Sequence, residues 1–121
     1  FEKKKSGTIA VISSVAGDRG RASNYIYGSA KAMINTFASG LRQRLNKQNV
    51  NIVTIKPGFI DTPMTKNIKK NFLWVTPSYI APIIIKSIKL KKSEVYVPSF
   101  WRLIMFVIKL IPNFIFKRIY F

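Results

Sequence analysis

The 121-residue sequence contains no cysteine and no histidine. Without cysteine, these residues can form no disulfide, no thiolate nucleophile and no cysteine-bound metal site. Without histidine, Ser-His-Asp and Cys-His catalysis are excluded, as are the usual zinc sites, and we expect no metal. Only Glu2, Asp18, Asp61 and Glu94 carry carboxylates, and no two of them form an evident acid–base pair for glycoside chemistry. Chemistry in this chain therefore has to use serine, threonine, tyrosine, lysine or arginine.

The scarcity of acidic residues leaves 21 lysines and arginines largely unbalanced, with a formal net charge of +17. Such a charge raises the question of nucleic-acid binding. The basic residues are spread along the chain with no recognisable nucleic-acid module around them, so we expect no nucleic-acid partner. Two explanations stay open. One is attraction to an anionic membrane surface, to which each nearby basic residue adds about 1 kcal/mol; the other is a lysine bias on a solvated surface.

Short apolar runs alternate with segments of helical periodicity. The first two runs are β-branched and continuous, a pattern typical of strands buried on both faces. Thr76 followed by Pro77 predicts the start of a helix. The predicted strands and helices occupy residues 7–14, 27–47, 51–55, 77–91 and 94–97. This order predicts an α/β fold with a doubly wound parallel sheet, which binds its ligand at the carboxyl ends of the strands.

Three strands make only half of such a sheet and would leave one apolar edge bare. The glycine-rich phosphate turn of nucleotide-binding folds is also missing, because Gly17-x-x-Gly20 lacks the required spacing and opens no helix directly. The first residue is Phe1, not methionine. We therefore expect residues 1–98 to be the C-terminal half of a Rossmann-type catalytic domain, with its nucleotide-binding half in front of Phe1.

Ser14, Tyr27 and Lys31 carry the clearest chemical signal. Positions i and i+4 of a helix share one face, so Tyr27 and Lys31 can point into the same cleft. A neighbouring ammonium favours the phenolate form of a tyrosine, and a serine hydroxyl at the end of the preceding strand can hydrogen-bond a substrate oxygen. These roles describe carbonyl reduction or alcohol oxidation with a cofactor that carries the hydride. Taken alone, Tyr-x-x-x-Lys is equally well a surface pair on a helix.

The strings around these residues resemble the short-chain dehydrogenase/reductase family over about residues 7–97. They are ISSVAG at 12–17, YGSAK at 27–31 and PGFIDT at 57–62. The resemblance implies an NAD(P)-dependent oxidoreductase that interconverts a ketone and a secondary alcohol, with Ser14 and Tyr27 flanking the reacting carbonyl. It also implies an NAD or NADP site in which the Ile60 backbone and the Thr62 hydroxyl meet the carboxamide. The implied cofactor-binding residues are Tyr27, Lys31, Pro57, Gly58, Ile60 and Thr62.

Two longer strings, SSVAGDRGRASNYIYGSAKA and TIKPGFIDTPMT, are similar to the reductase partners of the polyprenylphosphoryl-ribose 2-epimerisation system. This resemblance implies a 2-keto sugar carried on a lipid phosphate, a partner oxidase and a role in cell-envelope polysaccharide biosynthesis. Arg19, Arg21 and Asn24 lie in the loop over the expected substrate site, where an arginine can hold a phosphodiester with two parallel hydrogen bonds. The alternative is that Asp18 forms a local salt bridge with Arg19 or Arg21 that shapes the loop.

The tail, residues 99–121, is mostly aromatic and aliphatic, punctuated by basic residues. Its longest uncharged run is broken by Lys109 and Pro112, and is too short for the roughly twenty apolar residues of a spanning helix. The composition suits a segment in the membrane interface, and a helix packed on the sheet or on a dimer mate is the alternative. We expect a cytoplasmic protein with peripheral membrane contact through residues 100–121.

Alternatives from different classes therefore stay open. The first is an oxidoreductase acting on a lipid-linked sugar or on another carbonyl, such as a fatty acyl or steroid-like ketone. The second is a non-catalytic fragment that serves as a packing or membrane-binding module. The family usually pairs through the helix that carries Tyr27, so we also expect a homo-oligomer. One apolar stripe on that helix is expected to contain Met33, Ile34, Phe37, Ala38, Leu41 and Leu45.

Overall fold

The three predicted strands form one parallel sheet in the computed structural model, which describes residues 1–121. β1 (Thr8–Ile12), β2 (Asn51–Pro57) and β3 (Glu94–Val97) lie in the order β1-β2-β3. Ile12 pairs with Ile55, and Pro57 pairs with Val97. The carboxyl ends of the strands therefore meet at one edge of the sheet, and the predicted α/β fold is confirmed.

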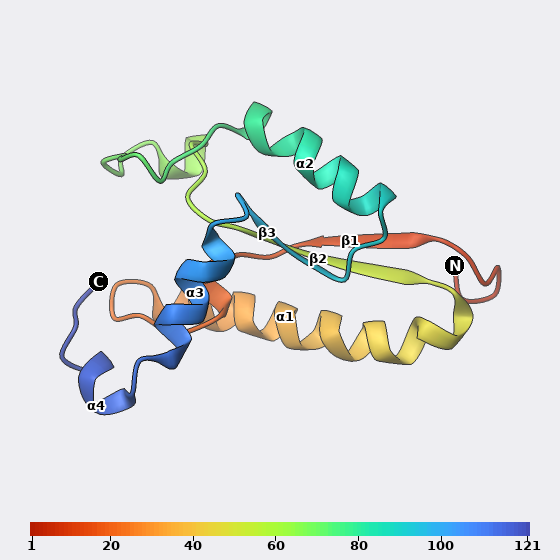
Figure 1. Ribbon diagram of the computed structural model, residues 1–121, viewed down its shortest axis with the longest axis horizontal. Helices are drawn as coiled ribbons and strands as arrows, with labels where there is room; N and C mark the ends of the chain where they lie inside the picture. Colours follow the sequence, from red (N-terminus) through yellow and green to blue (C-terminus); the bar gives the residue numbers. More distant parts are fainter.

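The two long connections are helices on opposite faces of the sheet, as Figure 1 shows. α1 (Tyr25–Leu45) covers one face and α2 (Pro77–Lys89) the other. The predicted start of α2 is confirmed, because the Thr76 hydroxyl accepts a hydrogen bond of 3.3 Å from the Tyr79 N–H. The remaining helices are η1 (Val15–Gly17), η2 (Asn46–Gln48), η3 (Pro63–Thr65), α3 (Trp101–Leu110) and α4 (Asn113–Phe116).

Each face of the sheet has its own apolar cluster. Alternate residues of β2 supply both, with Ile52 packing under α1 and Val53 and Ile55 packing under α2. β2 is buried from Ile52 to Pro57 because it has a neighbour on either side. The prediction that the first strand is buried on both faces is wrong for this chain. β1 lies at an edge of the sheet, and Ile12 is 52% exposed.

The apolar residues of α1 do not form the single stripe that the sequence suggested. Ala38 and Leu45 are buried and Leu41 packs with them against the sheet, whereas Met33 and Phe37 are each 69% exposed. A helix lying on a sheet buries an arc of little more than 100°. Met33 and Phe37 fall outside that arc, so Leu41 belongs to the core and not to an outward-facing stripe.

The tail folds as α3 and α4, and α3 crosses the carboxyl end of the sheet (Figure 1). Trp101 and Met105 are buried there against Val15, in a third apolar cluster. The other side of α3 is exposed, including Leu103 and Phe106. None of the helices combines the length and the apolar character that crossing a membrane requires.

Candidate active site

The serine pair lies where β1 ends. Ser13 and Ser14 are both buried. Ser14 caps the short helix η1, and its Oγ accepts a hydrogen bond of 3.1 Å from the Ala16 N–H. The Ser13 hydroxyl donates to the Lys31 carbonyl oxygen at 3.3 Å. Ser13 thus fixes the loop to α1. Ser14 only accepts in its bond with Ala16, so its hydroxyl proton remains available for another partner.

Two glycines allow α1 to lie in direct backbone contact with this loop. A Cβ at Gly28 would be 2.9 Å from the Ala16 carbonyl oxygen. A Cβ at Gly17 would be 2.6 Å from the Asn35 side chain and 2.7 Å from the Lys31 carbonyl carbon. Neither position has room for a side chain. The first turns of α1 therefore reach the serine pair more closely than alanine would permit.

Tyr27 and Lys31 lie on the turns of α1 nearest the end of β1. The Lys31 ammonium donates to the Ile12 carbonyl oxygen at 3.4 Å and lies 5.5 Å from the centre of the Tyr27 ring. Tyr27 is 37% exposed and lines the same cleft as Ser14. A hydroxyl, a phenol and an ammonium are therefore grouped at the carboxyl end of the sheet, as the Ser14–Tyr27–Lys31 spacing suggested.

The cleft has a volume of about 680 Å³. It lies between the loop after β1, the start of α1 and the segment after β2. Six of the predicted site residues line it: Ser14, Arg21, Asn24, Tyr27, Gly58 and Ile60. Four others lie outside its wall: Arg19, Lys31, Pro57 and Thr62. Lys31 stands behind Tyr27, and Pro57 is buried in the last position of β2.

The segment after β2 forms the opposite wall of the cleft. The Gly58 N–H donates to the Val97 carbonyl oxygen at 3.0 Å, and the Trp101 indole occupies the space that a side chain at Gly58 would need. Ile60 pairs with Val75 in a parallel bridge, where the neighbouring Asp61 N–H donates to Val75. The Ile60 N–H itself has no acceptor within the chain. Ile60 therefore lines the cleft and has a peptide N–H with no partner within the chain.

Comparison with known proteins decides the family. The family described as short chain dehydrogenase matches residues 1–72. The chain belongs to the short-chain dehydrogenase family. An uncharacterized oxidoreductase of Mycobacterium tuberculosis is 38% identical over 112 residues, which are 93% of this chain and 45% of that protein. An uncharacterized oxidoreductase of Streptomyces coelicolor is 33% identical over 98% of this chain and 47% of its own length.

More distant similarities agree with this assignment. A 3-oxoacyl-acyl-carrier-protein reductase of Chlamydia trachomatis is 42% identical over 69 residues, which are 57% of this chain and 28% of that reductase. A short-chain dehydrogenase of Burkholderia cenocepacia, solved in complex with NADP, has the same fold at a TM-score of 0.70 and 20% identity. That likeness covers 88% of this chain and 48% of the other. The chain spans about half the length of the curated relatives that it matches.

Asp18 binds neither of the two arginines, Arg19 and Arg21, that the sequence offered as its partners. Its carboxylate binds the Lys56 ammonium at 2.7 Å and accepts a hydrogen bond from the Tyr96 hydroxyl. Lys56 also pairs with Glu94. Burial lowers the pKa of Lys56, but the bonds to Asp18 and Glu94 outweigh that effect and hold it above its ordinary value. Burial and the bond to Asp18 raise the pKa of Tyr96 to about 12. The salt bridge to Arg19 or Arg21, which the sequence left open as an alternative, does not form.

Arg19 and Arg21 point to different parts of the molecule. The Arg19 guanidinium donates to the Ile108 and Ile111 carbonyl oxygens at 2.5 and 2.6 Å and lies 3.7 Å from the Phe116 ring centre. It thereby adds a side-chain donor to two carbonyl groups at the C-terminal end of α3. The Ile108 carbonyl also accepts from the Ile111 N–H at 3.3 Å, whereas the Ile111 carbonyl has no donor from the main chain. The Arg21 carbonyl accepts from the Asn24 N–H at 3.0 Å, whereas the Arg21 guanidinium makes no hydrogen bond within the chain, and the residue lines the cleft.

Thr65 is a site residue that sequence reasoning missed. Its hydroxyl accepts from the Thr62 N–H and lies 3.0 Å from the carbonyl oxygens of both Ile60 and Thr62, between which it shares its one proton. It therefore holds the loop that presents the Ile60 peptide, and it lines the cleft, which Thr62 does not. The available signal was the threonine three residues after Thr62, the spacing of a capping box.

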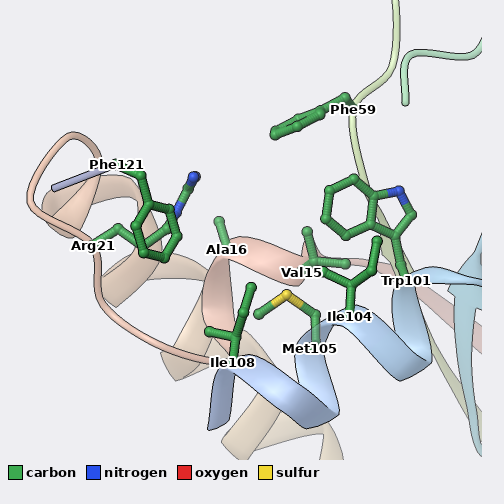
Figure 2. A pocket seen from close by; sticks show the side chains of 9 residues that line it. All are labelled: Val15, Ala16, Arg21, Phe59, Trp101, Ile104, Met105, Ile108 and Phe121. Atoms are coloured by element: carbon green, nitrogen blue, oxygen red, sulfur yellow. The ribbon is translucent and has the colours of Figure 1, made fainter. Parts of the chain in front are cut away.

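An apolar chamber of about 210 Å³ adjoins the cleft (Figure 2). Val15, Ala16, Arg21 and Phe59 belong to both walls. Arg21 is the only charged residue around the chamber, and its guanidinium carbon lies 5.7 Å from the centre of the Phe121 ring. The remaining lining residues are Trp101, Ile104, Met105 and Ile108 from α3, together with Phe121.

Proposed function

We propose that this chain carries the proton-transfer site of an NAD(P)-dependent oxidoreductase that interconverts a ketone and a secondary alcohol. One observation carries the proposal. Ser14 and Tyr27 line a single cleft at the carboxyl ends of parallel strands, with the Lys31 ammonium 5.5 Å from the centre of the Tyr27 ring. Parallel α/β sheets bind their ligands at that edge.

Each residue has a distinct part in the reduction. The Tyr27 hydroxyl donates its proton to the carbonyl oxygen of the substrate. The Ser14 hydroxyl, whose proton is not used in its bond with the Ala16 N–H, donates a hydrogen bond to the same oxygen. Lys31 stabilises the negative charge that remains on Tyr27. In alcohol oxidation the proton moves in the opposite direction, from the substrate hydroxyl to Tyr27.

The residues of the cleft fit a nicotinamide cofactor, NAD or NADP. When bound, such a cofactor supplies or accepts the hydride at the substrate carbon. The unpaired Ile60 N–H is a donor suited to the carboxamide oxygen, and the Thr65 hydroxyl keeps that loop in place. Lys31 has donors to spare for ribose hydroxyls. Pro57, Gly58 and Thr62 would support the same loop.

For the substrate we propose a 2-keto sugar on a lipid phosphate. The support is the junction of the cleft with the apolar chamber at Arg21. The hydrocarbon part would enter the chamber, and Arg21 would bind the phosphate with two parallel hydrogen bonds. Asn24, on the cleft wall, would contact the sugar. A fatty acyl ketone is the competing substrate, and it would need no anion contact from Arg21.

The remaining proposals concern organisation. We assign residues 1–98 to the C-terminal half of a Rossmann-type catalytic domain and residues 99–121 to a tail that closes the apolar chamber. We also propose a homo-oligomer paired through the outward face of α1, where Met33 and Phe37 are exposed. A partner oxidase would complete an epimerisation by supplying the 2-keto sugar.

The test is turnover by the full-length protein, followed as oxidation of NADH or NADPH with a lipid-linked 2-keto sugar and with an acyl ketone. We expect Tyr27→Phe to lower kcat by about 10²- to 10⁴-fold while cofactor binding is retained. Tyr25→Phe is the matched control, because Tyr25 is 62% exposed on the same turn of α1. A Tyr27→Phe variant with more than about a tenth of the rate would contradict the proton-transfer role. Absence of turnover with every carbonyl tried would favour the non-catalytic module.

A further inference from the structure

α3 has two apolar faces. One consists of Trp101, Ile104, Met105 and Ile108 and lines the chamber. The other consists of Leu103, Phe106, Val107 and Leu110, and each of these side chains is more than half exposed. Both sets follow the i, i+3, i+4, i+7 spacing of a helical stripe. Since the second set is displaced from the first by two residues, about 200° of helix rotation, the stripes point in opposite directions.

Exposed apolar side chains also follow the end of α3, on α4. Phe114 is 64% exposed and Ile115 is 43% exposed. Phe116 and Phe121 turn inward instead, the first against the Arg19 guanidinium and the second into the chamber. The inward aromatics hold the tail against the domain while its other side chains face solvent. We call the exposed set the α3 surface: Leu103, Phe106, Val107, Leu110, Phe114 and Ile115.

Basic residues border the α3 surface, and acidic ones are missing from it. Arg102 and Lys109 are exposed and lie two turns apart along one edge of the stripe. Lys117 and Arg118, which directly follow α4, are also exposed. No aspartate or glutamate follows Glu94 in the sequence. A patch of aliphatic and aromatic side chains edged only by positive charge is complementary to a surface that offers hydrocarbon beneath anionic groups.

We propose that the α3 surface docks on an anionic lipid bilayer, with α3 lying in the plane of the interface. A second copy of the chain fits less well, because a symmetric contact would bring the four basic side chains toward their counterparts. Nucleic acid fits less well, because leucine, valine and isoleucine gain nothing from phosphates. The inference stands on the exposed stripe and its charge, and it is independent of the reaction proposed for the cleft.

The test is sedimentation of the full-length protein with vesicles of phosphatidylcholine alone and of phosphatidylcholine mixed with phosphatidylglycerol. We expect binding to the mixed vesicles, with only partial release at high salt, because apolar insertion persists when charge is screened. Leu103→Ser with Phe106→Ser should weaken binding more than about tenfold. Arg102→Gln with Lys109→Gln should weaken it by about fivefold or more per residue at low salt.

Matched controls separate this surface from general stickiness and general charge. Phe72→Ser with Ile85→Ser removes two exposed apolar side chains elsewhere, at 91% and 53% exposure. Lys47→Gln with Lys92→Gln removes two exposed charges elsewhere. Both control variants should bind vesicles like the wild type. Equal losses in the control and test variants would overturn the proposal, as would equal binding to neutral and anionic vesicles.

A second measurement does not depend on those variants. An environment-sensitive fluorophore on Leu110→Cys should shift to shorter wavelength when anionic vesicles are added, and the same label on Phe72→Cys should not. An unchanged Leu110→Cys spectrum on sedimenting protein would overturn the proposal. The proposal would also be overturned if the Leu103→Ser/Phe106→Ser variant bound vesicles normally and only lost its oligomers. The α3 surface would then be a protein interface.

Discussion

The Asp18 carboxylate and the Lys56 ammonium are 2.7 Å apart, and their side chains are only 4% and 8% exposed. Asp18 follows the helix that Ser14 caps, whereas Lys56 lies in the central strand. The Tyr96 hydroxyl, from β3, completes the contact on the other carboxylate oxygen. A single buried carboxylate therefore ties the serine loop to two strands of the sheet.

Loss of one partner from this pair should be strongly destabilising. Asp18→Asn would leave Lys56 buried with only the half-exposed Glu94 as counter-ion, and we expect a cost of about 3 kcal/mol in the free energy of unfolding. Glu2→Gln is the matched control, because the Arg44–Glu2 pair is exposed and should contribute no more than about 1 kcal/mol. Denaturant titration of the full-length protein measures both. Equal effects would show that the buried pair adds nothing.

Stability should fall in alkaline solution because of the same cluster. The pKa of Tyr96 is raised to about 12 from an ordinary value of 10.0, and that of Lys56 is raised as well. The folded state therefore keeps protons that the unfolded chain releases, so this contribution is complete below pH 10 and disappears toward pH 12. Unfolding free energies across that range should show the decline. Tyr96→Phe should flatten it, and an unchanged slope would refute the assignment.

The two site glycines should be intolerant of even one methyl group. Gly28→Ala forces a Cβ against the Ala16 carbonyl oxygen, so α1 must move away from the serine pair. We expect a fall in kcat of about 10²-fold, because displacement of catalytic groups by about 1 Å costs that much. Gly40→Ala is the control in the same helix, where a Cβ meets nothing within 4 Å. It should leave kcat unchanged and stabilise the helix by up to about 1 kcal/mol.

Substitution of Lys31 should change both kcat and KM for the cofactor, whereas substitution of Tyr27 should change kcat alone. Lys31→Met removes the charge beside Tyr27 and the donor proposed for the cofactor, so kcat should fall and KM for the cofactor should rise together. Tyr27→Phe should lower kcat with little change in cofactor binding. Steady-state kinetics together with a titration of NADH fluorescence separates these cases. A Lys31→Met variant with a normal cofactor dissociation constant would confine the lysine to proton transfer.

The two neighbouring arginines should give different phenotypes. Arg21→Gln should raise KM for a phosphate-bearing lipid substrate by about 10-fold or more, since a charge-assisted bidentate contact is lost, and should leave the melting temperature nearly unchanged. Arg19→Gln should lower the melting temperature, because the Ile111 carbonyl loses its donor and the Ile108 carbonyl keeps only the Ile111 N–H. Thermal melts and substrate saturation curves on both variants provide the check. Equal changes in melting temperature and in substrate KM for the two variants would contradict the different roles assigned to Arg19 and Arg21.

Local signals in the sequence predicted the elements well. Nearby residues or helical periodicity determine three of these features: the order of strands and helices, the Thr76–Pro77 start of α2, and the shared cleft of Ser14 and Tyr27. The partners of Asp18 and Arg19 could not be found in this way. Lys56 is 38 residues from Asp18 in the sequence, and Ile108 is 89 residues from Arg19, so folding alone brings each pair together. A lysine inside the apolar strand NIVTIKP was the one hint that a buried carboxylate was needed.

At Gly17 and Gly28 the serine loop lies against the main chain of α1, with the Asn35 side chain also close to Gly17, and Ser14 and Tyr27 line the same cleft. The loop between those contacts contains Arg21, Ser23 and Asn24, which line the cleft. Replacements in this loop can change which molecule is admitted without disturbing the hydroxyl and the phenol that we propose to act on it. On the proposed mechanism, the residues that select the substrate are therefore separate from those that carry out the reaction, and the two glycines mark the boundary between the two sets.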